Sequence, residues 1–188
     1  RQAELLHLAE LLALPTVPRR VEGFDVSHLS GTRGVASRVV FVNGEAVPAM
    51  HRRYNLPEAP QHPDDYASLE AAVARRFRRT SGAADEWPEV VLIDGGKGQL
   101  GAAAHALEVV MEAMPEPQRR KLRAPLLLSL AKREELVYVV GRDDPVNADV
   151  DVDAPAMRLL RRVRDEAHRH ALQSHRRRRE RGVRAAGA

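Results

Sequence analysis

The stretch Val90-Val-Leu-Ile-Asp-Gly-Gly-Lys-Gly-Gln-Leu100 decides the fold of this chain. Four apolar residues, three of them β-branched, predict a buried strand that ends at Asp94, and the glycines that follow allow a sharp turn out of it. Open α/β sheets bind ligands at the carboxyl ends of their strands, so Asp94 is a candidate metal ligand. The alternative is that Asp94 only opens a tight turn, because Asp-Gly is a common turn pair.

A lysine among glycines after a strand also suggests a phosphate-binding loop, but the spacing does not fit. The P-loop needs four residues between its first glycine and a Gly-Lys-Ser/Thr end, whereas Lys97 directly follows two glycines and precedes a third. The glycine pattern of dinucleotide-binding folds matches only out of register. We therefore interpret this stretch as a strand end and not as a nucleotide cradle.

Length and composition indicate one domain of an intracellular protein. The chain has 188 residues, enough for a single well-buried core with room for a tail. It has no cysteine, which excludes disulfides and thiolate zinc sites and suits a cytoplasmic protein. The longest apolar run, residues 124–131, is too short to cross a bilayer, so no membrane association is expected. The chain begins at Arg1 without a signal pattern, and we expect it to be a piece of a longer polypeptide.

Positive charge is concentrated at the end of the chain. The formal net charge is +4, but residues 151–188 hold 11 arginines against 5 acidic residues. A run such as His175-Arg-Arg-Arg-Arg179 can be a solvated helix end or a flexible tail. Phosphate backbones reward such clustering, so we favour nucleic acid as the partner.

The first half of the chain predicts a helix followed by antiparallel strands. Leucines at helical spacing predict a lead-in helix over residues 3–14. Asn43-Gly44 is a strong hairpin signal. The alternation of residues 20–28 predicts a strand, residues 35–42 predict a second strand, and residues 46–54 complete a third. Asp25 lies within the first of these strands.

The second half predicts alternating helices and strands. A helix opens at Asp64-Asp65, and its apolar stripe is Leu69, Val73 and Phe77. The strand that ends at Asp94 comes next. The remaining predicted elements are a helix over 100–114, a strand over 125–130 with 135–140 as its partner, and a long helix from Pro155 to about Arg179. The buried stripe of that last helix is predicted to be Leu160, Val163, Ala167 and Ala171.

Asp65 and His168 each allow a plain and a functional interpretation. Asp65 lies in or beside the first turn of its helix, where acidic residues are favoured as caps, although a doubled aspartate permits a second role. His168 shares a helix face with Asp165, while His170 points the opposite way, so the two histidines cannot bind one metal together. A helical histidine beside an apolar stripe is more often a hydrogen-bonded core residue than a ligand.

The order of elements matches the ribonuclease H-like plan. The predicted fold class is α/β, with a mixed five-stranded sheet, three antiparallel strands first and then parallel strands, flanked by helices. In that plan the first and fourth strands are neighbours, so Asp25 and Asp94 would face one another. Two adjacent carboxylates repel unless a cation lies between them, which favours a hard ion such as Mg²⁺ or Mn²⁺.

Six ordered blocks carry a specific resemblance to a known family. The chain resembles the C-terminal ribonuclease H-like endonuclease domain of UvrC, the incision subunit of bacterial nucleotide excision repair, over roughly residues 15–180. The blocks are Phe24-Asp-Val-Ser-His28, Val35-Ala-Ser-Arg-Val-Val-Phe41, Arg52-Arg-Tyr54, Asp64-Asp-Tyr-Ala67, Leu92-Ile-Asp-Gly-Gly-Lys-Gly-Gln-Leu100 and Arg164-Asp-Glu-Ala-His-Arg-His-Ala171. His51 and His170 stand where this family usually has aromatic residues.

The resemblance implies a nuclease that makes the 5′ incision beside a DNA lesion. Asp25, Asp94 and His168 would be the catalytic set and the metal ligands, with Asp65 as a fourth acidic residue of the site. Damaged double-stranded DNA and UvrB would be the partners, UvrB through segments outside this chain. The expected divisions are a lead-in helix and linker (1–18), the endonuclease domain (19–180) and a tail (181–188).

A histidine on the last helix, where this plan usually has a carboxylate, favours one metal ion over two. We expect the DNA backbone to be contacted by Lys97, Lys132, Arg164, Arg176, Arg177, Arg178 and Arg179. The alternative from another class is a ribonuclease H-like platform that binds DNA or docks proteins without catalysis. That interpretation needs a broken site, and both carboxylates and the histidine are present.

Overall fold

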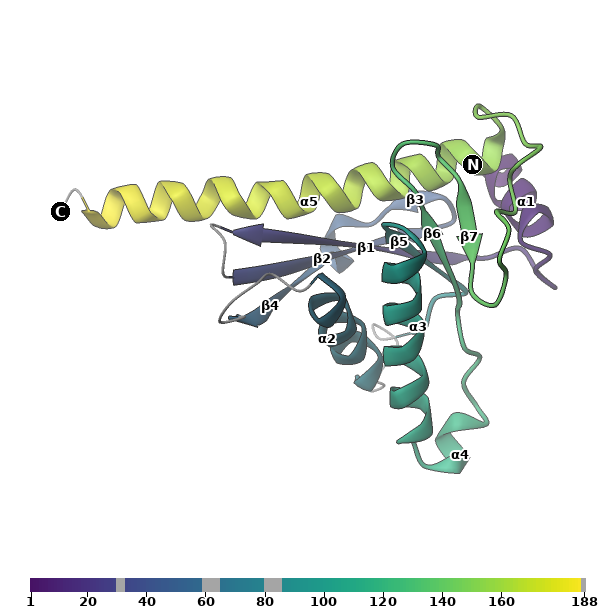
Figure 1. Cartoon of the computed structure of the whole chain (residues 1–188), viewed down its shortest axis with the longest axis horizontal. Coiled ribbons are helices and arrows are strands. Elements are labelled where there is room, and N and C mark those ends of the chain that lie inside the picture. Colours follow the sequence, from purple (N-terminus) through teal and green to yellow (C-terminus); the bar gives the residue numbers. More distant parts are fainter. Residues whose placement is uncertain (30–32, 59–64, 80–85, 187–188) are drawn as a thin grey trace.

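A mixed sheet with helices on both faces organises the chain (Figure 1). The structure is a computed structural model. It describes residues 1–29, 33–58, 65–79 and 86–186, and the backbone alone at residues 27–29, 33, 57–58 and 174–186. Among the helices described, none is both long and apolar enough to cross a membrane.

The sheet of the described chain has seven strands. They are β1 (Arg20–Leu29), β2 (Arg33–Val42), β3 (Glu45–Ala46), β4 (Arg52–Glu58), β5 (Val90–Asp94), β6 (Leu126–Leu130) and β7 (Val137–Val139). Their order across the sheet is β3-β2-β1-β5-β6-β7, and β4 pairs with β2 on the same side as β3. The neighbours β1, β5 and β6 run parallel, and the other pairs are antiparallel. The predicted arrangement, antiparallel strands first and then parallel ones with the first strand beside β5, is confirmed.

Two layers of helices enclose the sheet. The helical elements are α1 (Gln2–Leu11), the 3₁₀ turn η1 (Pro48–Met50), α2 (Asp65–Arg78), α3 (Lys97–Glu112), α4 (Glu116–Arg119) and α5 (Pro155–Ala186). Figure 1 shows α5 along one face of the sheet and α2 with α3 on the other. Each face buries its own apolar cluster.

Two details of the predicted elements are wrong. The single third strand over 46–54 is instead β3, the turn η1 and β4, because Pro48 has no N–H for a ladder and begins a 3₁₀ turn. With this split, and with β7 pairing antiparallel to β6, the sheet has seven strands rather than five. The last helix also continues to Ala186, past its predicted end near Arg179.

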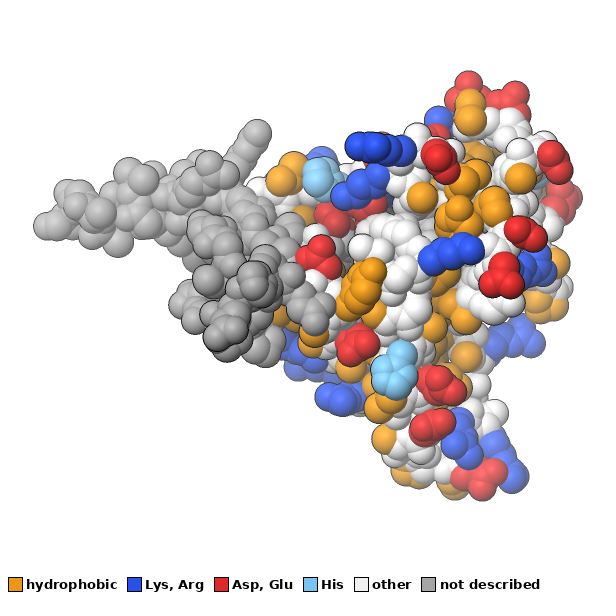
Figure 2. All heavy atoms as spheres, in the orientation of Figure 1, with side chains coloured by type: hydrophobic (Ala, Val, Ile, Leu, Met, Phe, Trp, Pro, Cys, Tyr) orange, Lys and Arg blue, Asp and Glu red, His pale blue; other side chains and the backbone are white. Residues whose placement is uncertain are grey.

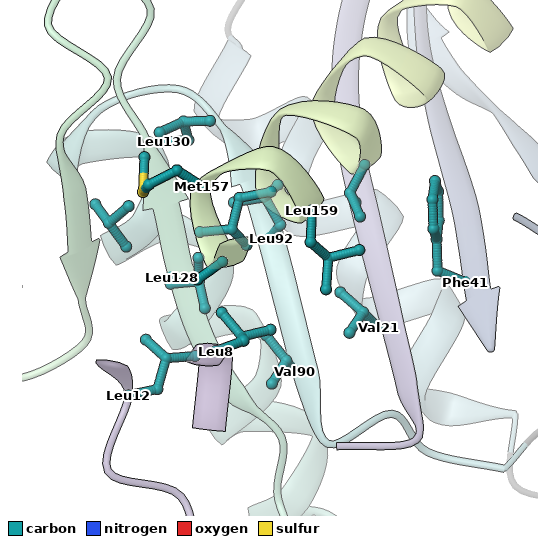
Figure 3. Packing of buried hydrophobic residues seen from close by; sticks show 14 of the residues in the cluster. Leu8, Leu12, Val21, Phe41, Val90, Leu92, Leu128, Leu130, Met157 and Leu159 are labelled. Carbon is teal, nitrogen blue, oxygen red and sulfur yellow. The ribbon is translucent and has the colours of Figure 1, made fainter. Parts of the chain in front are cut away.

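The core on the α5 face joins residues from both ends of the chain. The predicted stripe of α5 is buried, with Leu160, Val163 and Ala167 fully inaccessible. Helix α1 contributes Leu5 and Leu8, and Leu12 directly after it joins them, so the lead-in helix packs into this core and against α5. Figure 3 shows labelled members from α1 and the residue after it, from the strands and from α5: Leu8, Leu12, Val21, Phe41, Val90, Leu92, Leu128, Leu130, Met157 and Leu159.

The core on the other face seats α2 and α3. Leu69, Val73 and Phe77 of α2 are buried at 1% exposure or less, as their helical spacing predicts. They pack in one cluster with Phe24 of β1 and Ile93 of β5. Because strand residues alternate between faces, the residues that follow, Asp25 and Asp94, turn towards α5 instead.

Candidate active site

Asp25 and Asp94 are brought together by the pairing of β1 with β5. The parallel register places Phe24 beside Ile93, so the next residue of each strand is an aspartate. Asp94 is the last residue of β5, at the carboxyl edge of the sheet. Asp25 is 4% exposed, and the side chain of Asp94 is 2% exposed. Two nearly inaccessible carboxylates thus lie side by side, one inside β1 and one at the end of β5.

Helix α5 adds His168 to this pair. Nδ1 of His168 lies 3.1 Å from Oδ2 of Asp25, and the imidazole side chain is 54% exposed. The buried stripe of α5 fixes the phase of the helix, with Ala167 and Ala171 against the sheet. One ligand atom from each of Asp25, Asp94 and His168 lies within 4.8 Å of the other two.

The electrostatics of the pair are unfavourable without a counter-ion. Burial raises the pKa of Asp25, and the hydrogen bond with His168 lowers it in part. Burial and then repulsion from Asp25 raise the pKa of Asp94, and the charges of Lys132 and Arg164 lower it in part. Both carboxyl groups therefore resist ionisation more than an exposed aspartate, as expected where two buried acids lie close together.

The three side chains fit a hard divalent ion. Oδ1 of Asp94 is buried and has no hydrogen-bond partner, so it has a lone pair available for a ligand bond. Two carboxylate oxygens and one imidazole nitrogen suit Mg²⁺ or Mn²⁺ better than soft metals. Ligand atoms on opposite sides of such an ion are about 4.2 Å apart, so small side-chain movements would close the group around it.

A cleft of about 380 Å³ opens beside the carboxylates. Its lining includes Asp25, Asp94 and Lys132, together with Gln99 and Asp65. Asp65 is the exposed first residue of α2 and faces this cleft, but it is not part of the three-residue group described above. A larger hollow of about 740 Å³ between α2 and α3 has neither aspartate in its lining, so chemistry rather than size identifies the site.

A second, smaller cleft of about 290 Å³ lies on the α5 side of Asp94. Its lining is Asp94, Lys132, Glu135, Arg164, Asp165 and His168. Figure 2 shows acidic, basic and histidine side chains gathered beside α5 on this face of the molecule. Asp94 and Lys132 line both clefts and so form the boundary between them.

The structure separates the basic residues predicted to contact DNA. Nζ of Lys132 is 3.8 Å from Oδ2 of Asp94, and Arg164 lines the second cleft. Lys97 is elsewhere: its ammonium lies over the ring of Tyr138 at 4.9 Å and donates to the carbonyl of Asp143. The side chains of Arg176, Arg177, Arg178 and Arg179 lie outside the described residues, although their backbone is helical.

His170 and His168 contact different neighbours, as their helical spacing predicts. The ring of His170 packs edge-on against His51, with centroids 5.2 Å apart. Nδ1 of His51 accepts the N–H of Val40 at 3.2 Å, so Nε2 carries the proton and donates to Glu166 at 3.0 Å. The two positions where aromatic residues were expected are therefore in contact with each other.

Glu135 was missed by the interpretation of the sequence. It lies in the turn between β6 and β7 and lines the second cleft. The available signal was its place shortly after β6, because β6 neighbours β5 and its carboxyl end opens at the same sheet edge. The run Lys132-Arg-Glu-Glu135 nevertheless resembles an ordinary charged turn.

Comparisons with known proteins identify the family of this chain. Residues 9–172 match the family described as "UvrC RNAse H endonuclease domain". The UvrABC system protein C of Cyanothece sp. is 42% identical over 182 residues, which are 92% of this chain and 27% of that protein. The protein of the same name from Gloeobacter violaceus is 45% identical over 92% of this chain and 26% of its own length. The chain thus spans about a quarter of the length of these relatives.

Solved structures of another nuclease show more distant similarity. Endonuclease V of Ciona intestinalis, in complex with inosine-containing DNA, is 18% identical with a TM-score of 0.39, covering 60% of this chain and 46% of that one. Human ENDOV is 18% identical with a TM-score of 0.38, covering 68% and 56%.

Proposed function

Because the chain belongs to the UvrC ribonuclease H endonuclease domain family, we propose that it makes the 5′ incision beside a DNA lesion in a UvrABC excision-repair system. The proposed reaction is hydrolysis of a phosphodiester that depends on a divalent metal ion. The observation that carries this proposal is the convergence of Asp25, Asp94 and His168 at the carboxyl edge of the sheet.

Asp25, Asp94 and His168 would hold the ion. When bound, Mg²⁺ or Mn²⁺ would supply positive charge for the scissile phosphate and a water molecule of lowered pKa. The shared burial of the two carboxylates serves this purpose, because charge interactions are stronger where water is excluded. Asp65 faces the same cleft and is proposed as a fourth residue of the site, an acidic one.

His168 has a second capability. If Nδ1–H donates to Asp25, the neutral ring leaves Nε2 unprotonated and able to bind a cation or to accept a proton. The half-exposed side chain can exchange that proton with solvent. His168 can thus act as a ligand or as a general acid and base during hydrolysis.

Lys132 and Arg164 are proposed to hold the DNA backbone beside Asp94. Both lie within the lining of the second cleft, and both offset the buried negative charge. Contacts to phosphate position a strand without reading its sequence, which suits an enzyme that must cut wherever damage lies. Damaged duplex DNA and UvrB are the proposed partners, with UvrB bound through segments other than these residues, and the cytoplasm is the proposed location.

The test is incision of a lesion-bearing duplex by the whole protein that carries this chain, together with UvrA and UvrB. Asp25→Asn and Asp94→Asn should each abolish the 5′ cut and leave DNA affinity measured in EDTA nearly unchanged. Wild-type rates in both variants would reject the proposal. The platform alternative would be favoured if the wild-type protein bound DNA equally with and without EDTA and cut none of it.

A further inference from the structure

Glu135 is held in a backbone conformation that its residue type disfavours. Its φ is +51°, in the left-handed region, which non-glycine residues rarely adopt. The N–H of Glu135 donates to the carbonyl of Ala131 at 3.0 Å, and Asn147 Nδ2 donates to the carbonyl of Glu135 at 2.8 Å. Asn147 is itself buried and accepts the N–H of Val137 at 2.7 Å. The turn is therefore fixed from two sides at a strained residue.

The fixed turn presents the Glu135 carboxylate to the catalytic helix. Its Oε1 lies 3.4 Å from Nη1 of Arg164, and its Oε2 lies 3.4 Å from Nη1 of Arg161. The two arginines are three residues apart and so share one face of α5. The carboxylate is 24% exposed, which leaves it partly shielded from the screening that weakens surface ion pairs.

Arg164 is the partner of Glu135 that reaches the site. It stands one helical turn before His168, is 17% exposed, and lines the second cleft with Asp94. Its Nε and Nη2 also contact Oδ1 of its neighbour Asp165, at 3.1 and 3.0 Å. Its charge lowers the pKa of Asp94 in part, after burial and Asp25 have raised it. A free arginine would lose rotamer freedom on binding phosphate, and an arginine that is already held loses less.

We propose that Glu135 is a positioning residue, which holds Arg164 beside Asp94 so that the guanidinium contacts a phosphate of the strand being cut. The proposal deepens the function proposed above and rests on it. Glu135 touches neither aspartate nor the histidine in the described contacts and acts through Arg164. The Glu135 carboxylate lies in a cleft proposed to bind DNA, and its negative charge repels the phosphates. Holding Arg164 in place for a phosphate offsets this repulsion.

Arg161 provides a matched control. It contacts the same carboxylate at the same distance, but it has a second partner in Asp153 at 3.0 Å and is not part of the cleft lining. If Glu135 served only to hold the turn against α5, replacing Arg161 would slow incision as much as replacing Arg164. If Glu135 positions Arg164, only the second loss slows incision.

The experiment is a double-mutant cycle in the whole protein, with single-turnover incision by the UvrA and UvrB-dependent reaction as the readout. Glu135→Gln should lower the rate constant at saturating protein on the order of tenfold, without raising the protein concentration needed for half-maximal rate. The same substitution in an Arg164→Ala background should lower the rate constant less than about twofold, because the arginine through which Glu135 acts has already been removed. Glu135→Asp should restore part of the rate, and Arg161→Ala should cut like wild type.

DNA binding without metal provides a readout that does not depend on activity. In EDTA, Arg164→Ala should reduce the slope of log affinity against log salt by about 0.9, the value for one phosphate contact, and Arg161→Ala should leave it unchanged. Two results would overturn the role of Glu135: an unchanged rate in Glu135→Gln, or an equal loss in the wild-type and Arg164→Ala backgrounds. Failure of the wild-type protein to cut would reject the proposed function instead.

Discussion

Gly23 of β1 lies directly against Val163 of α5: a Cβ built on Gly23 would stand 2.5 Å from Cγ1 of Val163 and 3.4 Å from its carbonyl oxygen. This contact is two residues before Asp25 and five before His168. It brings the backbone of the helix close enough to the strand for His168 to contact Asp25. The missing side chain at Gly23 thus sets the separation on which the site depends.

We expect Gly23→Ala to cost roughly 1–3 kcal/mol of unfolding free energy, because the added methyl overpacks a contact between a strand and a branched side chain. The same change should slow incision by moving His168 away from Asp25. Urea unfolding and incision rates check the two effects. Val163→Ala, which removes the clashing Cγ1, should recover part of both losses in the double variant.

Gly101 supplies the control for that substitution. It lies in α3, and a Cβ built on it would meet no atom of the described residues within 4 Å outside its own stretch of helix. Gly101→Ala should therefore stabilise the helix by about 0.5–1 kcal/mol. Equal effects of Ala at Gly23 and Gly101 would show that the close packing of α5 on β1 does not constrain the site.

Neutralising each of two acidic residues of β1 should affect the stability of the protein by very different amounts. Glu22 is fully buried, and burial alone would raise its pKa, but Arg76, Arg38 and Arg20 outweigh this and hold the pKa below its ordinary value. Glu22→Gln leaves the buried arginines without their counter-charge and should lower the free energy of unfolding by about 3–5 kcal/mol. Asp25→Asn relieves repulsion with Asp94 and should change metal-free stability by less than about 1 kcal/mol.

Unfolding in urea with EDTA present measures both variants. A loss in Asp25→Asn as large as that in Glu22→Gln would mark Asp25 as a structural residue. The two residues lie three apart in the same strand, so each variant changes an acid to its amide in the same element. Their side chains point to opposite faces of the sheet, so the two variants test different surroundings.

Replacing His168 and replacing His170, both on α5, should have different effects on incision. His168→Ala should remove incision while preserving the fold, because the side chain is half-exposed and contacts Asp25. His170→Phe should retain incision, because His170 packs against His51 and not against the carboxylates. Incision rates and thermal unfolding of both variants decide the matter. Similar loss of cutting in the two would mean that the helix is out of phase with the proposed site.

His51 should make the folded protein less stable as the pH falls below about 6.5. Burial lowers the pKa of this imidazole below its ordinary 6.5, with the contact to Glu166 acting in the opposite direction. Between the folded pKa and 6.5 the unfolded chain binds more protons, so stability rises with pH there and is lost as pH falls. His51→Phe should be less stable at pH 7.5, having lost the acceptor for Val40 N–H, yet lose less stability on going to about pH 5.5.

Urea unfolding of both proteins at the two pH values tests this prediction, because the comparison cancels the shared groups that do not interact with His51. A parallel pH dependence in wild type and His51→Phe would show that His51 does not resist protonation in the folded state.

Sequence patterns predicted those parts of the molecule that depend on local periodicity. The apolar run before Asp94 predicted a buried strand and the stripe of α5 predicted the phase of the last helix, and the structure bears out both. The prediction that β1 and β5 are neighbours came from the order of the elements, and it is also confirmed. The single strand predicted over 46–54 overlooks Pro48, whose missing N–H breaks the ladder and begins a 3₁₀ turn. Two other contacts could not be predicted because they join residues that are far apart in the sequence. Nothing local indicates that Gly23 meets Val163, or that Glu135 adopts a left-handed turn facing Arg164.

Binding of Mn²⁺ to the metal-free protein tests the central claim most directly. Titration calorimetry should show one saturable site in the wild-type protein and a loss of affinity of about 100-fold or more in Asp94→Asn, whose orphaned Oδ1 is a proposed ligand. His170→Phe should bind as wild type. Absence of saturable binding in the wild-type protein, or undiminished binding in Asp94→Asn, would contradict the account of this site.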